Sequence, residues 1–136
     1  MSGIVAYIDG GARGNPGPAG YGVRIEDESG TLIEEFNGFL GNATNNVAEY
    51  NGLLAALRYA QAHGHGKVRI KSDSELLVKQ LKGEYRVKNP GLLLLYQQAR
   101  AIAESLERIS FEHVRREHNK DADRLANLAM DKGTSQ

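Results

Sequence analysis

Apolar and polar residues follow two different periods along this chain, and the changes of period predict its elements. Residues 3–9 form a short β-branched and aromatic run between glycines, which is typical of a strand. Residues 21–28 and 31–40 alternate apolar and polar positions and predict two further strands of an antiparallel meander. The glycine-rich residues 10–20 between the first two strands predict a flexible turn.

The second half of the chain alternates helical and extended patterns. Residues 44–63 carry an apolar residue at every third or fourth position, and Gly64 ends this predicted helix. The same reasoning predicts the remaining elements, which are a strand at 67–73, helices at 74–83 and 92–106, a strand at 108–116 and a helix at about 121–131. A meander followed by alternating strands and helices predicts an α/β fold. Its five-stranded mixed sheet is antiparallel in the first three strands, parallel in the last two, and flanked by helices.

Length and composition limit the organisation and the chemistry of the chain. Its 136 residues fit a single domain, 1–136, with a core of about 3–131 and a frayed tail. The absence of cysteine excludes disulfides, thiolate zinc sites and a thiol nucleophile. No segment approaches the ~18–20 apolar residues of a membrane span. We therefore expect a soluble cytoplasmic monomer. The net charge is zero, so overall charge does not predict a polyanion partner, and only local clusters of basic residues can indicate one.

Four acidic residues fall at the ends of predicted elements. Asp9 closes the first strand, Asp73 closes the strand at 67–73, and Glu49 and Asp123 lie near the starts of two helices. Neighbouring parallel strands would bring Asp9 and Asp73 to one sheet edge, where open α/β sheets hold ligands. Packed carboxylates repel one another unless a cation is present, and hard oxygen ligands favour Mg²⁺ or Mn²⁺. Capping or the helix dipole also explains each acid taken alone, and explains Glu49 and Asp123 better than it explains Asp9, so position leaves both readings open.

Four local sequences, in order, carry a resemblance to a known family. They are YIDGGARGNPGPAGYG at 7–22, TNNVAEYNGLLAAL at 44–57, IKSDSELLVKQL at 70–81 and REHNKDADRLANLA at 116–129. Together they resemble ribonuclease H of type 1 over residues 4 to about 130, and this implies a ribonuclease H-like fold. The glycine-rich segment matches neither the dinucleotide fingerprint nor the Walker phosphate loop.

The resemblance implies which acids are catalytic and bind metal. The family's metal-binding acids fall on Asp9, Glu49, Asp73 and Asp123. Asp121 competes for the last position, but the family places this acid four residues after an asparagine, and Asp123 is four residues after Asn119. Asp121 is then expected to be a helix cap.

The resemblance also implies contacts with nucleic acid. Asn15, Asn45 and Asn46 match residues that contact the minor groove, and Thr44 matches a phosphate contact. Thr44 is equally suited to cap the helix that follows it. Arg13, between small residues, is a candidate phosphate clamp, although a solvated arginine is the ordinary alternative.

The activity that the resemblance implies is endonucleolytic hydrolysis of the RNA strand of an RNA–DNA hybrid. Two Mg²⁺ ions, with Mn²⁺ as a possible substitute, would assist the reaction and leave 5′-phosphate and 3′-hydroxyl ends. One departure concerns a mobile-loop histidine that many family members use in proton transfer. The aligned position here holds Arg116 or Glu117, and His118 could replace the histidine from the next position.

A second departure from the family pattern concerns the residues that bind the substrate. Some relatives insert a basic helix with tryptophans after the second helix, whereas this chain has no tryptophan. A local positive face with one aromatic residue remains in the same region, at Lys79, Lys82, Tyr85, Arg86 and Lys88. We expect weak, salt-sensitive binding of the hybrid.

Two alternatives remain beside this reading. The chain could be a catalytically weak or inactive hybrid-binding module of the same fold, which the altered histidine loop leaves open. It could also be a different nuclease on this scaffold, such as a transposase-like or junction-resolving relative. The TNN and GNPGP sequences favour ribonuclease H over the latter.

Overall fold

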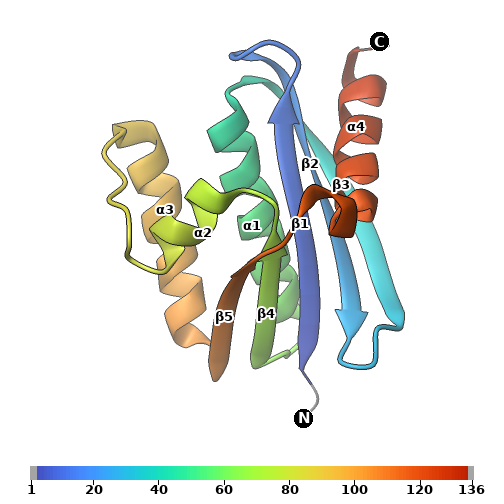
Figure 1. The fold of residues 1–136 in the computed structure, drawn as a ribbon, viewed down its shortest axis with the longest axis vertical. Coiled ribbons are helices and arrows are strands. Elements are labelled where there is room, and N and C mark those ends of the chain that lie inside the picture. The colour runs from blue at the N-terminus through green and yellow to red at the C-terminus, as the bar shows by residue number, and fades with distance from the viewer. Residues whose placement is uncertain (1–2, 135–136) are drawn as a thin grey trace.

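A computed structural model describes residues 3–134 (Figure 1). In chain order the elements are β1 (Ile4–Ala12), β2 (Gly17–Asp27), β3 (Leu32–Ala43), α1 (Asn45–Ala62), β4 (Lys67–Ser72), α2 (Glu75–Leu81), α3 (Pro90–Ser105), β5 (Arg108–His113), the 3₁₀ helix η1 (Arg116–His118) and α4 (Lys120–Thr134). This order confirms the predicted succession of strands and α-helices. The last predicted strand is shorter than expected, because the chain turns into η1 after it.

The strands form one mixed sheet in the order β3-β2-β1-β4-β5. β2 is antiparallel to both β1 and β3, whereas β4 is parallel to both β1 and β5, which confirms the predicted topology. In the parallel pair Ile8 lies beside Ser72. Asp73 therefore follows β4 directly and comes next to Asp9, which does not close β1 as predicted, because the strand continues through Ala12.

Helices lie against both faces of the sheet (Figure 1). A side chain at Gly10 would collide with Ala48 in α1, and one at Gly22 would collide with Ala122 in α4. Gly22 pairs with Asp9, the neighbour of Gly10, and adjacent residues of a strand face opposite ways. Helix α1 therefore covers one face, with α3 packed against it, and α4 covers the other.

The glycine-rich segment is not the flexible turn that we predicted. Strand β1 continues through Ala12 and β2 begins at Gly17, and Gly11 pairs with Gly20 in the ladder between them. Only residues 13–16 connect the two strands, and the Asn15–Pro16 peptide bond is cis. Gly10 of this segment serves close packing, because a Cβ there would overlap the backbone of α1.

The helix starts confirm one predicted cap and correct another. The Thr44 hydroxyl accepts a hydrogen bond from the Val47 amide at 3.2 Å and caps α1. Asp121 is not a cap, because α4 already begins at Lys120. The Asp121 carboxylate instead lies 3.5 Å from the Arg124 guanidinium in the first turn of α4.

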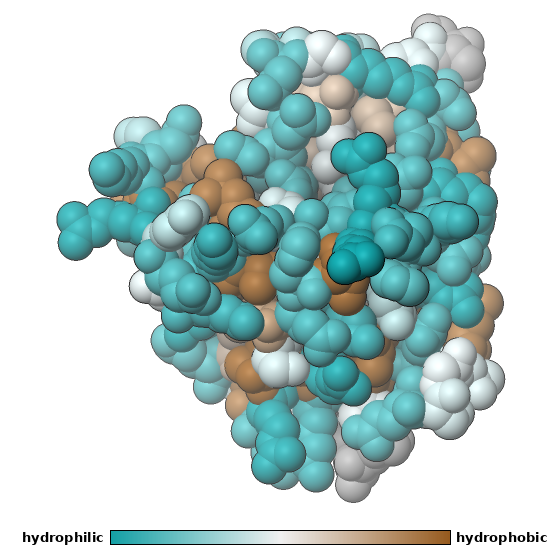
Figure 2. Space-filling model, viewed as in Figure 1, coloured by the Kyte–Doolittle hydropathy of each residue, from teal (hydrophilic) through white to brown (hydrophobic). Residues whose placement is uncertain are grey.

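The core fills the space between the sheet and the helices, and its largest fully buried apolar residues are Ile4, Ile8, Val23, Ile25, Tyr50, Leu53, Leu54, Leu57, Val68 and Ile70. The surface in Figure 2 is largely hydrophilic. Apolar side chains interrupt it over α2 and α3, where Leu76, Leu93 and Leu94 are exposed. Among residues 3–134, no helix combines the length and the apolar character needed to cross a bilayer.

Candidate active site

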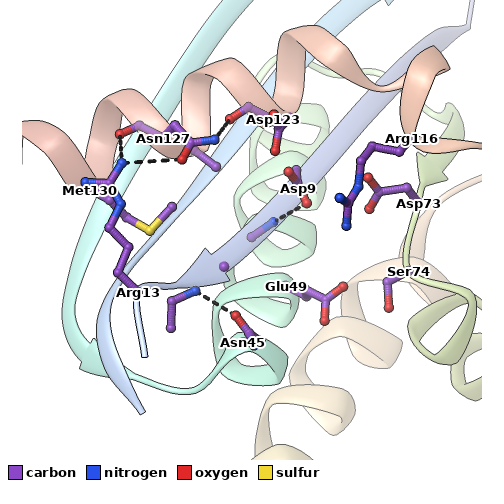
Figure 3. Close-up of a pocket in the computed structure, with 14 residues that line it drawn as sticks. Asp9, Arg13, Asn45, Glu49, Asp73, Ser74, Arg116, Asp123, Asn127 and Met130 are labelled. Carbon is purple, nitrogen blue, oxygen red and sulfur yellow. Dashed lines mark hydrogen bonds between the residues drawn. The ribbon is translucent and has the colours of Figure 1, made fainter. Parts of the chain in front are cut away.

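A cleft of about 450 Å³ opens at the edge of the sheet where β1 and β4 end (Figure 3). All four acids singled out in the sequence lie on its wall. The residues that line it are Asp9, Gly10, Gly11, Ala12, Arg13, Asn45, Glu49, Asp73, Ser74, Arg116, Asp123, Ala126, Asn127 and Met130.

Each acid is placed by a different element. Asp9 lies in β1, where one carboxylate oxygen accepts a hydrogen bond from the Gly10 amide at 2.9 Å. Asp73 directly follows β4, Glu49 lies near the start of α1, and Asp123 lies in the first turn of α4. The parallel pairing of β1 with β4 and the packing of α1 and α4 on opposite faces thus direct four carboxylates into one cleft.

Burial and the charge of Asp73 disfavour the ionised forms of Asp9 and Glu49. Burial, the charge of Asp73 and hydrogen bonding to Asp123 raise the pKa of Asp9 to about 8. Burial and, to a smaller extent, Asp73 raise the pKa of Glu49 to about 7, although a hydrogen bond from the Ser74 hydroxyl opposes the shift. The cleft therefore favours a bound positive charge.

Arg116 supplies a positive charge from the protein itself. It lies in η1, and Figure 3 shows its guanidinium next to the Asp73 carboxylate. Burial raises the pKa of Asp73, whereas hydrogen bonding to Asn119 and the charge of Arg116 act in the opposite direction. Arg116 thus favours the ionised form of one acid in the cleft.

The donor chemistry of the cleft suits a hard divalent cation. Within the described part of the chain, no three histidine or carboxylate side chains already form a ligand set around one point. The four acids nevertheless offer only oxygen donors, which Mg²⁺ and Mn²⁺ prefer. A cation would also favour the ionised forms of Asp9 and Glu49, which burial and, to a smaller extent, the charge of Asp73 disfavour. The residues present therefore fit such a metal.

Comparison with known proteins agrees with this arrangement. Residues 7–129 match the reverse transcriptase-like family. Ribonuclease H1 of Halobacterium salinarum superposes with a TM-score of 0.92 at 40% identity, over 95% of this chain and 98% of that one. This chain belongs to the ribonuclease H type 1 family. Another member of the family, LC11-RNase H1 in complex with an RNA/DNA hybrid, superposes with a TM-score of 0.92 at 43% identity, over 96% of this chain and 99% of that one.

The family also occurs in longer proteins. The bifunctional protein Rv2228c of Mycobacterium tuberculosis is 49% identical to this ribonuclease H chain over 129 residues, which are 94% of this chain and 35% of that protein. This chain therefore spans about a third of the length of that relative.

The residues that the ribonuclease H resemblance assigned to substrate lie around one end of the cleft. Arg13 and Asn45 line it. Asn15 does not line it, but its side-chain oxygen accepts a hydrogen bond from the Asn45 amide at 3.0 Å. Thr44 caps α1, and Asn46 is exposed beside it. Their contacts with nucleic acid stay predictions.

His118 lies outside this cleft. It is exposed in η1 and borders a separate polar cavity together with Tyr7 and Arg24. The residue of η1 that lines the acid cleft is Arg116. Within the described residues, η1 thus presents Arg116, and not His118, to the acids, and a role of His118 in proton transfer stays a prediction.

Three further residues support the site and were not predicted from the sequence. Ser74 caps α2 and lines the cleft beside Glu49, and Asn127 lies one helical turn after Asp123 on the same face of α4. The spacing of Asn127 could have revealed it, because residues four apart share a helix face. Asn119 is buried and donates a hydrogen bond to the Ile8 carbonyl at 2.9 Å, which ties the start of α4 to β1.

Proposed function

We propose that this chain is an endoribonuclease that hydrolyses the RNA strand of RNA–DNA hybrids, leaving 5′-phosphate and 3′-hydroxyl ends. The observation that carries the proposal is the convergence of Asp9, Glu49, Asp73 and Asp123 in one cleft. A purely structural role for these acids would not require four carboxylates from four elements to share a site that raises the pKa values of Asp9, Glu49 and Asp73.

The hybrid is the substrate that the surroundings of the cleft favour. LC11-RNase H1, 43% identical to this chain, has been solved in complex with an RNA/DNA hybrid. The cleft is open, and Asn45 at its rim is exposed, so a duplex can approach without a rearrangement of the core. Asparagine side chains both donate and accept hydrogen bonds, which suits minor-groove edges and the 2′-hydroxyl that distinguishes RNA from DNA.

Mg²⁺, or Mn²⁺ in its place, would be held by Asp9, Glu49, Asp73 and Asp123. When bound, the metal supplies charge neutralisation and a more acidic water. Arg116 favours the ionised form of Asp73, and Ser74 favours that of Glu49, so each residue opposes part of the rise in pKa that burial causes. We propose that the protein acts as a cytoplasmic monomer.

Incubation with labelled duplexes tests the proposal. The purified protein is mixed with an RNA–DNA hybrid, an RNA–RNA duplex and a DNA–DNA duplex, in Mg²⁺ and separately in Mn²⁺. We expect cleavage of the RNA strand of the hybrid only, and its loss in Asp73→Asn. Retained hybrid binding without cleavage in either metal would support an inactive binding module instead.

A matched pair of variants tests the assignment of the last acid. Asp123 lines the cleft, whereas Asp121, two residues earlier in α4, faces Arg124. Asp123→Asn should abolish cleavage in Mg²⁺, and Asp121→Asn should retain at least about half of it, since an exposed ion pair contributes little. Equal losses in the two variants would contradict the assignment.

A further inference from the structure

Arg13 at the rim of the cleft is already paired with an acidic residue. Its Nη2 atom lies 2.6 Å from Oδ1 of Asp131 in α4. The same nitrogen donates at 3.4 Å to the side-chain oxygen of Asn127 and at 3.5 Å to its carbonyl (Figure 3). The side chains of Arg13 and Asp131 are 42% and 58% exposed, so solvent and solutes reach both partners.

The backbone that carries Arg13 is fixed from the opposite side. The Ala12 amide donates to the Asn45 side chain at 2.7 Å, and the Asn45 amide donates to the Asn15 side chain at 3.0 Å. The connection at 13–16 is thus tied to the start of α1, while the Arg13 side chain crosses to α4. The position of the guanidinium therefore depends on its partners in α4, not on a mobile loop.

A carboxylate and a phosphate diester present similar oxygen pairs to a guanidinium, and arginine binds both. An exposed ion pair contributes little to stability and can exchange partners readily. We propose that Asp131 is an intramolecular competitor for phosphate at Arg13, occupying the guanidinium in the free protein until a backbone phosphate of the bound hybrid replaces it. This inference rests on the proposed function, because it concerns the affinity of the same site for its substrate.

Asp131 then sets how tightly the rim holds nucleic acid. A backbone phosphate must displace the Asp131 carboxylate from Arg13 before it can bind there. This competition lowers the affinity of the protein for nucleic acid, most of all where the phosphate is poorly placed. Asp131→Asn should therefore tighten binding of the hybrid, but only while Arg13 is present. Simple removal of a negative charge would tighten binding whether or not Arg13 is present.

A double-mutant cycle on hybrid affinity separates the two explanations. Dissociation constants are measured by fluorescence anisotropy with a labelled RNA–DNA hybrid at low salt, in Ca²⁺ to suppress cleavage, for the wild type, Asp131→Asn, Arg13→Gln and the double variant. We expect Asp131→Asn to tighten binding about 2- to 5-fold and Arg13→Gln to weaken it. Adding Asp131→Asn to Arg13→Gln should change the affinity by less than about 1.5-fold.

Glu107→Gln is the matched control for net charge. Glu107 is also an exposed acid, 67% exposed beside Lys67 at the far end of β4, so its variant should leave affinity unchanged. An unchanged affinity in Asp131→Asn, or equal tightening with and without Arg13, would overturn the inference. Cleavage of the hybrid by the wild type would still support the proposed function in that case. Failure of the wild type to bind or cleave the hybrid would reject both.

Discussion

Gly22 is the position where a single added methyl group should most directly test how the site is assembled. It lies in β2 opposite Asp9, and α4 packs directly on it. A Cβ at Gly22 would lie 2.6 Å from both the Leu125 Cβ and the Ala126 amide nitrogen, and it would also overlap the Ala122 carbonyl. Two of these three neighbours are backbone atoms of α4, so no rotamer change can relieve the overlap.

The size of the effect follows from that overlap. Non-bonded carbon atoms rest at about 3.5–4 Å, so Gly22→Ala must push α4 outward by roughly 1 Å. Overpacking of this kind costs about 1–3 kcal/mol, which for a chain of this length lowers Tm by roughly 3–5 °C per kcal/mol. Asp123 is carried by the first turn of α4, so it should move away from Asp9 as well. A displacement of about 1 Å at a catalytic site can reduce activity about 100-fold.

Gly11→Ala is the control, because Gly11 lies in the neighbouring strand. A Cβ there would meet the Asn45 Oδ1 at 3.7 Å and the Met130 Cε at 3.9 Å, which are ordinary contacts. We expect its Tm to equal or exceed that of the wild type, since alanine restricts the unfolded chain. Thermal unfolding followed by circular dichroism measures both variants. Equal Tm values for Gly22→Ala and Gly11→Ala would refute the claim that α4 is seated on a glycine.

Three further outcomes follow from the structure. Between about pH 4 and 8 in metal-free buffer, Asp9 is protonated in the folded state and ionised in the unfolded chain, because its pKa is raised to about 8 on folding. The free energy of unfolding should therefore fall as pH rises through that window. Thermal unfolding across pH 5–9 in EDTA should show this fall, and Asp9→Asn should reduce it; an unchanged slope would count against it. Arg116→Gln removes a charge that favours ionised Asp73, so the acidic limb of the cleavage pH profile should move to higher pH; no movement would mean that Arg116 does not act on Asp73. Tyr50→Phe leaves the buried Gln80 side chain without the 2.7 Å bond from the Tyr50 hydroxyl, and chemical denaturation should show a loss of about 1–3 kcal/mol, whereas a loss below about 0.5 kcal/mol would disagree.

The sequence predicted the strands and helices well wherever one face of an element is buried. The spacing of Val47, Tyr50, Leu54 and Leu57 identified α1, because residues three and four apart face the same side of a helix and here they pack toward the sheet. The glycine-rich segment could not be predicted in the same way. A glycine that frees a turn and a glycine that lets a helix touch a strand look identical in sequence, and only the packing of α1 and α4 distinguishes them.

The choice between Asp121 and Asp123 shows what local spacing can decide. Two residues apart on a helix, the side chains point about 200° apart, so only one of them can face the cleft. The distance from Asn119 favoured Asp123, and the structure places Asp123 on the cleft wall and Asp121 against Arg124. Buried Asn119 determines which face of α4 is turned toward the cleft, because its hydrogen bond to the Ile8 carbonyl fixes the start of α4 against β1.

The strand predicted over 108–116 was extended too far, so the sequence did not indicate which side chain of residues 114–118 faces the acids. The fold resolves this by turning the chain through η1, which leaves His118 outside the cleft and brings Arg116 beside Asp73. An arginine remains charged at any physiological pH and cannot relay a proton as a histidine does. The contribution of Arg116 is therefore electrostatic, because its fixed charge favours the ionised form of Asp73.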